Sequence, residues 1–133
     1  MNKTITIIGS GWISQRFLNK YHNNFSNITT TSKSSNPHKH SNEHHWIDIY
    51  HQTYFSFYPS DICIITLPFS RKLTNPFDYT MAIRELLPKK ELAKFKQVLF
   101  TSSTSIYPNS EALVDETSLP DISERAQALH KTE

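Results

Sequence analysis

The sequence predicts a doubly wound α/β protein built on a parallel sheet. Three observations lead to this class. Short runs rich in β-branched residues alternate with segments of helical periodicity along the 133 residues. The strand-like runs are apolar almost throughout, as is typical of strands covered on both faces. Right-handed crossovers between parallel strands then favour the order 3-2-1-4-5 for about five strands.

The expected elements follow one another along a single domain spanning residues 1–133. The expected strands are Thr4–Ile8, Ile28–Ser32, Trp46–Ile49, Asp61–Leu67 and Gln97–Thr101. The expected helices cover residues 12–22, 51–58, 76–87, 89–95 and 121–133. The first helix is expected to turn Ile13, Phe17, Leu18 and Tyr21 to one face. Residues 33–44 are polar, contain Pro37 and are expected to form a loop.

Composition excludes several classes of function. The formal net charge is +2, which gives no indication of a nucleic-acid partner. No apolar stretch approaches the roughly 20 residues that a membrane helix needs, and a strand is expected almost from the first residue, without a signal peptide. The single cysteine, Cys63, lies in an apolar strand and cannot form a disulfide within the chain. These features predict a cytoplasmic protein.

The chain has only two glycines, and they stand close together at the end of the first strand. A strand, a glycine pair and an amphipathic helix together are typical of a site for a dinucleotide pyrophosphate. Gly9 would permit the tight turn, and Gly11 would let the backbone approach the phosphates. Amides at the start of the helix would face the ligand. The candidate binding residues here are Gly9, Ser10, Gly11, Trp12 and Ile13. Ser14 takes the place of the third glycine of the pattern, and a plain turn without ligand is the alternative.

The end of the second strand bears on the choice of cofactor. A site that prefers NAD usually has an acidic residue there, about 20 residues after the glycines, because a carboxylate binds the ribose 2′-hydroxyl. This chain has no acid in Thr29–Ser34 but does have Lys33. A lysine would attract the 2′-phosphate of NADP, so NADP is favoured over NAD. The alternative is that Lys33 is an ordinary loop lysine.

The fifth strand leads into Ser102-Ser103-Thr104-Ser105-Ile106-Tyr107, and Val114-Asp115-Glu116-Thr117 follows. With Ile64-Ile65-Thr66-Leu67-Pro68 in the fourth strand, these segments resemble the extended and atypical short-chain dehydrogenase/reductases, the NAD-dependent epimerase/dehydratase family. The resemblance implies a Rossmann-like fold, a dinucleotide cofactor and a nucleotide-sugar type of substrate. It implies that Thr66, Leu67 and Pro68 contact the cofactor, that Asp48 lies near the adenine, and that Ser103 is catalytic, orienting the reacting oxygen.

The chain departs from this family at the catalytic base. The family uses a tyrosine with a lysine four residues later, but Arg125 and Leu129 stand at these positions. Arginine is no general base at neutral pH, and leucine carries no charge. Pro108 also replaces the family's usual glycine. The C-terminal region that forms most of the family's substrate pocket is missing from these residues.

Three functional interpretations therefore stay open. The chain is the cofactor domain of an oxidoreductase of this family, or a module that binds NADP or a partner without catalysis. The third possibility is a fragment that folds only as a homo-oligomer, because residues 121–133 contain no helix-terminating glycine or proline.

Five histidines fall between residues 38 and 51. His40 and His44 have the spacing at which two imidazoles share a metal ion on a helix. The polar composition around Pro37 argues against a helix there, and no cysteine lies nearby. We therefore expect a solvated loop and no metal site.

Overall fold

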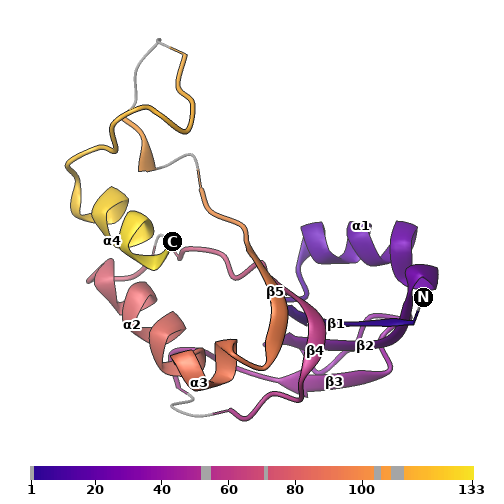
Figure 1. Cartoon of the computed structure of the whole chain (residues 1–133). Helices are drawn as coiled ribbons and strands as arrows, with labels where there is room; N and C mark the ends of the chain where they lie inside the picture. Colours follow the sequence, from indigo (N-terminus) through magenta and orange to yellow (C-terminus); the bar gives the residue numbers. More distant parts are fainter. Residues whose placement is uncertain (1, 52–54, 71, 104–105, 109–112) are drawn as a thin grey trace.

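The computed structural model describes residues 2–51, 55–70, 72–103, 106–108 and 113–133. Its strands form one parallel sheet in the order β3-β2-β1-β4-β5, which confirms the expected topology (Figure 1). The strands are β1 (Lys3–Ile8), β2 (Phe25–Ser32), β3 (Glu43–Trp46), β4 (Ser60–Ile65) and β5 (Phe95–Phe100). The helices are α1 (Trp12–Tyr21), η1 (His22–Asn24), α2 (Phe77–Leu86), α3 (Lys89–Leu92) and α4 (Glu124–Thr132).

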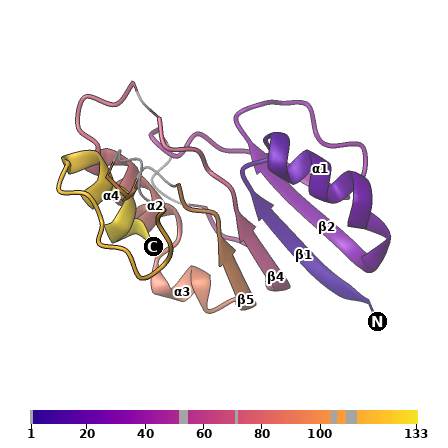
Figure 2. The same cartoon turned by 90° about the horizontal axis from the view of Figure 1, so that it is seen from above.

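Helices lie on both sides of the sheet. Figure 2 shows α1 over β1 and β2, while α2 and α4 lie together at the other end of the molecule. The alternation of side chains along β4 separates two apolar cores. Cys63 and Ile65 pack with α2, whereas Ile62 and Ile64 pack with the core that contains Leu18 of α1.

The lone thiol is enclosed in the larger of these cores. Cys63 is fully buried, and burial raises the pKa of its thiol to about 12. A thiol with so high a pKa is protonated at neutral pH and chemically inert. The expectation of a buried cysteine in a strand is confirmed.

The third strand differs from its expected position. Glu43–Trp46 pairs with Thr29–Ser32, whereas the expected strand was Trp46–Ile49. The apolar residues Ile47 and Ile49 are buried, but they follow the strand. The paired strand is polar because β3 lies at the edge of the sheet and its side chains bond to the loop before it. Burial and strand pairing therefore fall on successive segments here.

The expected helix over residues 51–58 is wrong for the described part of that segment. His51 lies in a turn, residues 55–58 have no helical structure, and residues 52–54 lie outside the described residues. The Phe57 N–H donates to the Glu91 Oε2 carboxylate oxygen at 2.9 Å instead of to a helical carbonyl. A buried acid from α3 thus replaces the hydrogen bond that a helix would make.

Three further expectations need correction. In α1 the buried residues are Ser14 and Leu18, whereas Ile13 is 54% exposed and Tyr21 is also exposed. The helix approaches the glycine turn so closely that the small Ser14 side chain faces the sheet. At the other edge, residues 96–99 of β5 are exposed, so this strand is not covered on both faces. The helix expected over residues 89–95 ends at Leu92, and β5 begins at Phe95.

Candidate functional site

The turn between β1 and α1 depends on Gly9. Gly9 has a φ of +97°, a conformation that residues with a side chain rarely adopt. A Cβ atom at this position would lie 3.0 Å from the backbone carbonyl carbon of Thr66. The amides of Gly9 and Ser10 both donate to the Thr31 carbonyl oxygen, at 3.1 and 2.8 Å. The turn is therefore fixed between the ends of β2 and β4.

Gly11 has a different environment. Its backbone is extended, with φ −86° and ψ −161°, and it is the N-cap residue of α1. A Cβ atom there would have no atom within 4 Å, so the space beside Gly11 is open. The first turn of α1 carries no acidic side chain. The first amides of a helix have no partner within it, and the helix dipole favours an anion at this end. The start of α1 can therefore accept a phosphate.

Ser14 and Thr66 bind the glycine turn from the inside. The Ser14 hydroxyl is buried and lies 2.7 Å from both the Gly9 carbonyl oxygen and the Thr66 hydroxyl. The Thr66 hydroxyl also donates to the Gly9 carbonyl oxygen. The serine at the third position of the glycine pattern thus has a structural role, since it ties α1 to the ends of β1 and β4.

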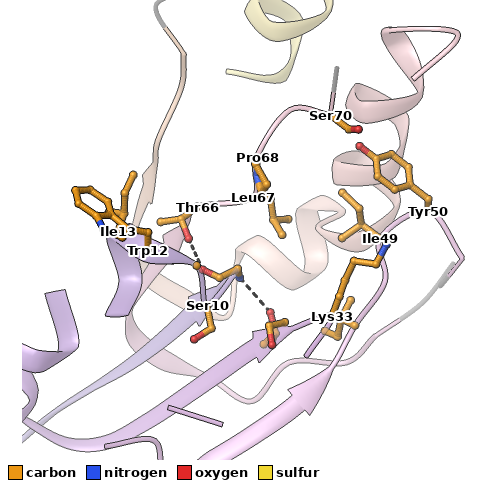
Figure 3. Close-up of a pocket in the computed structure, with 15 residues that line it drawn as sticks. Ser10, Trp12, Ile13, Lys33, Ile49, Tyr50, Thr66, Leu67, Pro68 and Ser70 are labelled. Atoms are coloured by element: carbon orange, nitrogen blue, oxygen red, sulfur yellow. Dashed lines mark hydrogen bonds between the residues drawn. The ribbon is translucent and has the colours of Figure 1, made fainter. Parts of the chain in front are cut away.

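A cavity of about 560 Å³ opens beside this turn, at the carboxyl ends of the strands (Figure 3). Trp12 and Ile13 lie at one end of it, and Lys33, Ile49 and Tyr50 lie at the other. The predicted site residues that line it are Gly9, Ser10, Gly11, Trp12, Ile13, Lys33, Thr66, Leu67 and Pro68. Asp48 is not among the lining residues. No acidic side chain occurs among the described residues that form its wall.

Sequence reasoning missed part of this wall. The additional lining residues are Thr31, Ser32, Ile47, Ile49, Tyr50 and Ser70. Figure 3 shows the Tyr50 hydroxyl pointing toward Ser70. That hydroxyl is buried and has no hydrogen-bond partner among the described residues, and burial raises the pKa of the phenol. The position of Ile49 and Tyr50 after a parallel strand was the available signal, because ligands of such sheets bind at the carboxyl ends of strands.

Lys33 and Asp48 form an ion pair at the edge of the cavity. Lys33 Nζ lies 2.8 Å from Asp48 Oδ2, and His51 Nδ1 lies 2.9 Å from the same oxygen. Asp48 Oδ1 accepts from the Tyr50 N–H at 3.1 Å. The hydrogen bond from Lys33 lowers the pKa of Asp48 to about 2, and the bonds from His51 and Tyr50 add to this effect against the cost of burial. Asp48 is therefore an ionised, buried carboxylate with both oxygens engaged.

The loop that carries Lys33 is held by side chains of β3. Trp46 Nε1 donates to the Lys33 carbonyl oxygen at 2.7 Å. His44 Nε2 lies 2.9 Å from the Ser34 carbonyl oxygen, and His44 Nδ1 lies 2.8 Å from the Thr30 hydroxyl. His44, Trp46 and Asp48 alternate along one extended segment, so they share one side of it. His44 contacts the Ser34 carbonyl oxygen, Trp46 donates to the Lys33 carbonyl oxygen, and Asp48 pairs with the Lys33 ammonium.

Ser103 lies in a different place from the glycine turn. It lines a second cavity of about 500 Å³ that shares no lining residue with the first. Ser102 donates there to the Glu133 carboxylate, and His130 Nδ1 lies 3.6 Å from Glu133 Oε2. Thr104 and Ser105 of the serine-rich motif lie outside the described residues. The structure thus brings together the predicted cofactor residues at one cavity wall except Asp48, which does not line it, and Ser103 lies elsewhere.

The positions of the family's catalytic pair are filled by groups with other roles. The Arg125 guanidinium carbon lies 4.9 Å from the centre of the Phe69 ring. Leu129 is buried in the core beneath α4. Neither side chain transfers a proton at neutral pH.

The histidines of the loop make contacts within the protein. His40 stacks on His22 with 3.5 Å between ring centres, and His44 bonds to the loop as described above. Across the described part of the chain, no group of three or more histidine, cysteine or acidic residues is placed to hold a metal ion.

No protein-family model matches this sequence, and no curated protein matches it. Solved structures do match the fold. One is a UDP-galactose 4-epimerase, with a TM-score of 0.74 and 20% identity over 98% of this chain and 49% of that one. Another is MoeE5 in complex with UDP-glucose and NAD, with a TM-score of 0.71 and 16% identity over 97% and 46%. A third is UDP-N-acetylglucosamine 4-epimerase from Bacillus cereus, with a TM-score of 0.69 and 15% identity over 98% and 50%.

These matches define the class of fold. The chain has a Rossmann-like α/β fold, and its structure is similar to a part of the UDP-galactose 4-epimerase and to a part of MoeE5. It spans about half the length of the structures that it matches. The resemblance noted from the sequence motifs is thereby confirmed for the fold. Among the helices of the described residues, none has the length and apolar character needed to cross a membrane.

Proposed function

We propose that this chain binds a nicotinamide dinucleotide in the cavity at the glycine turn, as the cofactor domain of an epimerase/dehydratase-type protein. The observation that carries the proposal is the open backbone at Gly11, where the start of α1 meets a cavity without acidic lining. Phosphates are commonly held in this way, by helix amides next to a glycine.

The ends of the cavity suit different parts of the ligand. The pyrophosphate would lie against the amides of Gly11, Trp12 and Ile13. The adenosine would lie between the ends of β2 and β3, where Ile47 and Ile49 offer apolar surface for a base. Thr66, Leu67 and Pro68 would contact the dinucleotide from the end of β4. Nicotinamide, when bound, supplies the hydride chemistry, while these residues bind and orient it.

The choice between NADP and NAD depends on Lys33. A cationic side chain at the cavity edge, with no acid in the wall, favours NADP. The ion pair with Asp48 opposes this preference because it neutralises the lysine. The adenine contact expected of Asp48 would have to use its backbone, since both carboxylate oxygens are engaged.

The second candidate function is binding without catalysis. Arg125 and Leu129 occupy the positions of the proton-transferring pair, and Arg125 lies on the Phe69 ring. This arrangement favours a module that holds NADP or a partner but turns over no nucleotide sugar. Ser103 would act as a catalytic residue only with the remainder of a substrate pocket around the second cavity. Turnover of a UDP-sugar with reduction of the cofactor would contradict this second candidate.

Isothermal titration calorimetry with NADPH and NADH tests the binding function. We expect both to bind the wild-type protein, and Gly11→Ala to weaken both, because a methyl group would fill the space beside the helix amides. The melting temperature of Gly11→Ala serves as the control for folding, since its backbone conformation suits alanine. Absence of heat and of thermal stabilisation at millimolar cofactor would rule the proposal out.

The proposal includes a cytoplasmic location for the protein. One enclosed thiol of high pKa is compatible with the reducing cytoplasm. A homo-oligomer is a further possibility that sedimentation would test, through the exposed apolar side chains of β5.

A further inference from the structure

Given the dinucleotide site proposed above, we propose that Asp48 determines cofactor choice by competing with the ligand for Lys33. Its carboxylate forms an ion pair with the lysine ammonium, which would otherwise bind a 2′-phosphate. Asp48 thus acts as an internal substitute for the missing acid at the end of β2. The site then discriminates little in favour of the phosphorylated nucleotide, although a lysine lies at its edge.

The geometry of the ion pair carries this inference. Lys33 is 65% exposed in its side chain and lines the cavity, whereas the Asp48 side chain is 8% exposed and lies behind it. The carboxylate is further fixed by the Tyr50 N–H and by His51. A buried, anchored anion holds its cation more firmly than a solvated one, because little water competes for the carboxylate.

The backbone of Lys33 has little freedom to carry the side chain elsewhere. Trp46 fixes its carbonyl oxygen, and His44 fixes the next peptide through Ser34. A phosphate that approaches Lys33 therefore meets the ammonium where Asp48 holds it, with a negative charge directly behind. The negative charges of the Asp48 carboxylate and the phosphate repel each other. The carboxylate therefore weakens the contact between Lys33 and the phosphate, even where one N–H of the lysine ammonium is left to donate to the phosphate.

The competition between Asp48 and the ligand for Lys33 is measured with two small ligands that represent the adenosine end of the dinucleotide. Adenosine 2′,5′-bisphosphate carries the additional phosphate, and AMP does not. Affinities are compared by calorimetry at about pH 8, above the range in which histidine normally titrates. We expect Asp48→Asn to raise the ratio of bisphosphate affinity to AMP affinity about tenfold, the value of one charge-assisted hydrogen bond. The double variant Asp48→Asn with Lys33→Gln should lose this gain.

A matched control exists at the other end of the sheet. Asp61 also pairs with a lysine, with Asp61 Oδ1 2.6 Å from Lys96 Nζ, and accepts from the Thr4 N–H at 2.8 Å. It lies outside the cavity wall. Asp61→Asn should leave the affinity ratio unchanged, which separates a local effect from a general change in charge.

A single variant of the exposed lysine keeps the test independent of how well Asp48→Asn folds. If Asp48 already occupies Lys33, Lys33→Gln changes the ratio less than about threefold. A loss of tenfold or more would show that the lysine is available and would overturn the inference. An unchanged ratio in a folded Asp48→Asn protein that binds AMP would also overturn it. If the wild-type protein binds neither ligand, the nucleotide-binding function itself fails, and the inference fails with it.

Discussion

At the scale of single residues, the two glycines of the β1–α1 turn have separate tasks. Gly9 is required by the backbone, through its positive φ and its contact with Thr66. Gly11 is in a conformation open to any residue, and only the empty space beside it gives a reason for a glycine. The first therefore serves folding, and the second, in the function proposed above, leaves room for a ligand.

This division predicts opposite results for two alanine variants. Gly9→Ala should destabilise the protein by about 1–3 kcal/mol, because it combines a strained φ with a backbone clash. Gly11→Ala should change stability by less than about 0.5 kcal/mol while weakening dinucleotide binding. Chemical denaturation measures the first quantity, and calorimetry measures the second. Equal loss of stability in both variants would contradict the assignment.

Asp48 gives a second residue-scale prediction, in the pH dependence of stability. Its pKa is lowered to about 2 in the folded protein, so its contribution is present above the ordinary carboxyl pKa near 4. That contribution is lost as the pH falls from about 4 toward 2. In this pH range, we expect the free energy of unfolding of Asp48→Asn to fall less steeply with decreasing pH than that of the wild type. Lys33→Met should have the same effect. Identical acid profiles for wild type and Asp48→Asn would count against the ion pair.

At the scale of elements, α4 is attached to α2 through a small set of polar contacts. The buried Thr80 hydroxyl donates to the Ala128 carbonyl oxygen at 2.8 Å and accepts from Thr132 at 3.0 Å. Arg84 Nη2 donates to the Lys131 carbonyl oxygen at 3.3 Å. Ala128 and Leu129 supply the buried apolar contact. The position of α4 thus depends on one threonine of α2 more than on any other side chain in this polar set.

Replacement of this threonine tests how α4 is held. Thr80→Val keeps the shape of the side chain but removes its hydroxyl, so stability should fall by about 1 kcal/mol. Amide hydrogen exchange should become faster in α4 than in the sheet, because the helix is released before the rest unfolds. Thr74→Val, at an exposed position before α2, is the control and should leave both quantities unchanged.

At the scale of the whole molecule, the sequence was sufficient for the topology. The order of the sheet follows from apolar strands, helical connections and the handedness of crossovers. The glycine turn was predictable because a positive φ and an open helix start both favour glycine, and the two glycines can be recognised in the sequence. The site residues from Gly9 to Ile13, with Lys33 and Thr66–Pro68, meet at one cavity as the strand ends predict.

Other features depended on contacts between distant residues and could not be predicted. The third strand was misplaced because the apolar pattern indicates Ile47 and Ile49, which are buried. The residues that pair with β2 are the preceding residues 43–46, which the apolar pattern does not indicate. The neutralisation of Lys33 required knowing that Asp48 faces it across two elements. The non-helical conformation of residues 55–58 involves Glu91, which is far along the chain. In each case a tertiary contact decided what local pattern left ambiguous.

The edge strand β5 has a consequence for behaviour in solution. Among the described residues it pairs only with β4, and Leu99 is 48% exposed on it. Exposed apolar edges promote association between chains, and lysine prevents it. We expect Leu99→Lys to lower concentration-dependent association in sedimentation, whereas Met81→Lys, on the exposed side of α2, should not. Indistinguishable sedimentation of the two variants would show that the edge is not involved.

The sulfhydryl of Cys63 lies on the second strand from that edge, enclosed by the core that α2 covers. An alkylating reagent can reach it only when β4 separates from the elements around it. Because this is the chain's sole cysteine, the rate of its modification under native conditions would record how often the interior opens. A bound nucleotide that joins the ends of β1, β2 and β4 would slow this reaction, so the protein carries its own reporter of occupancy.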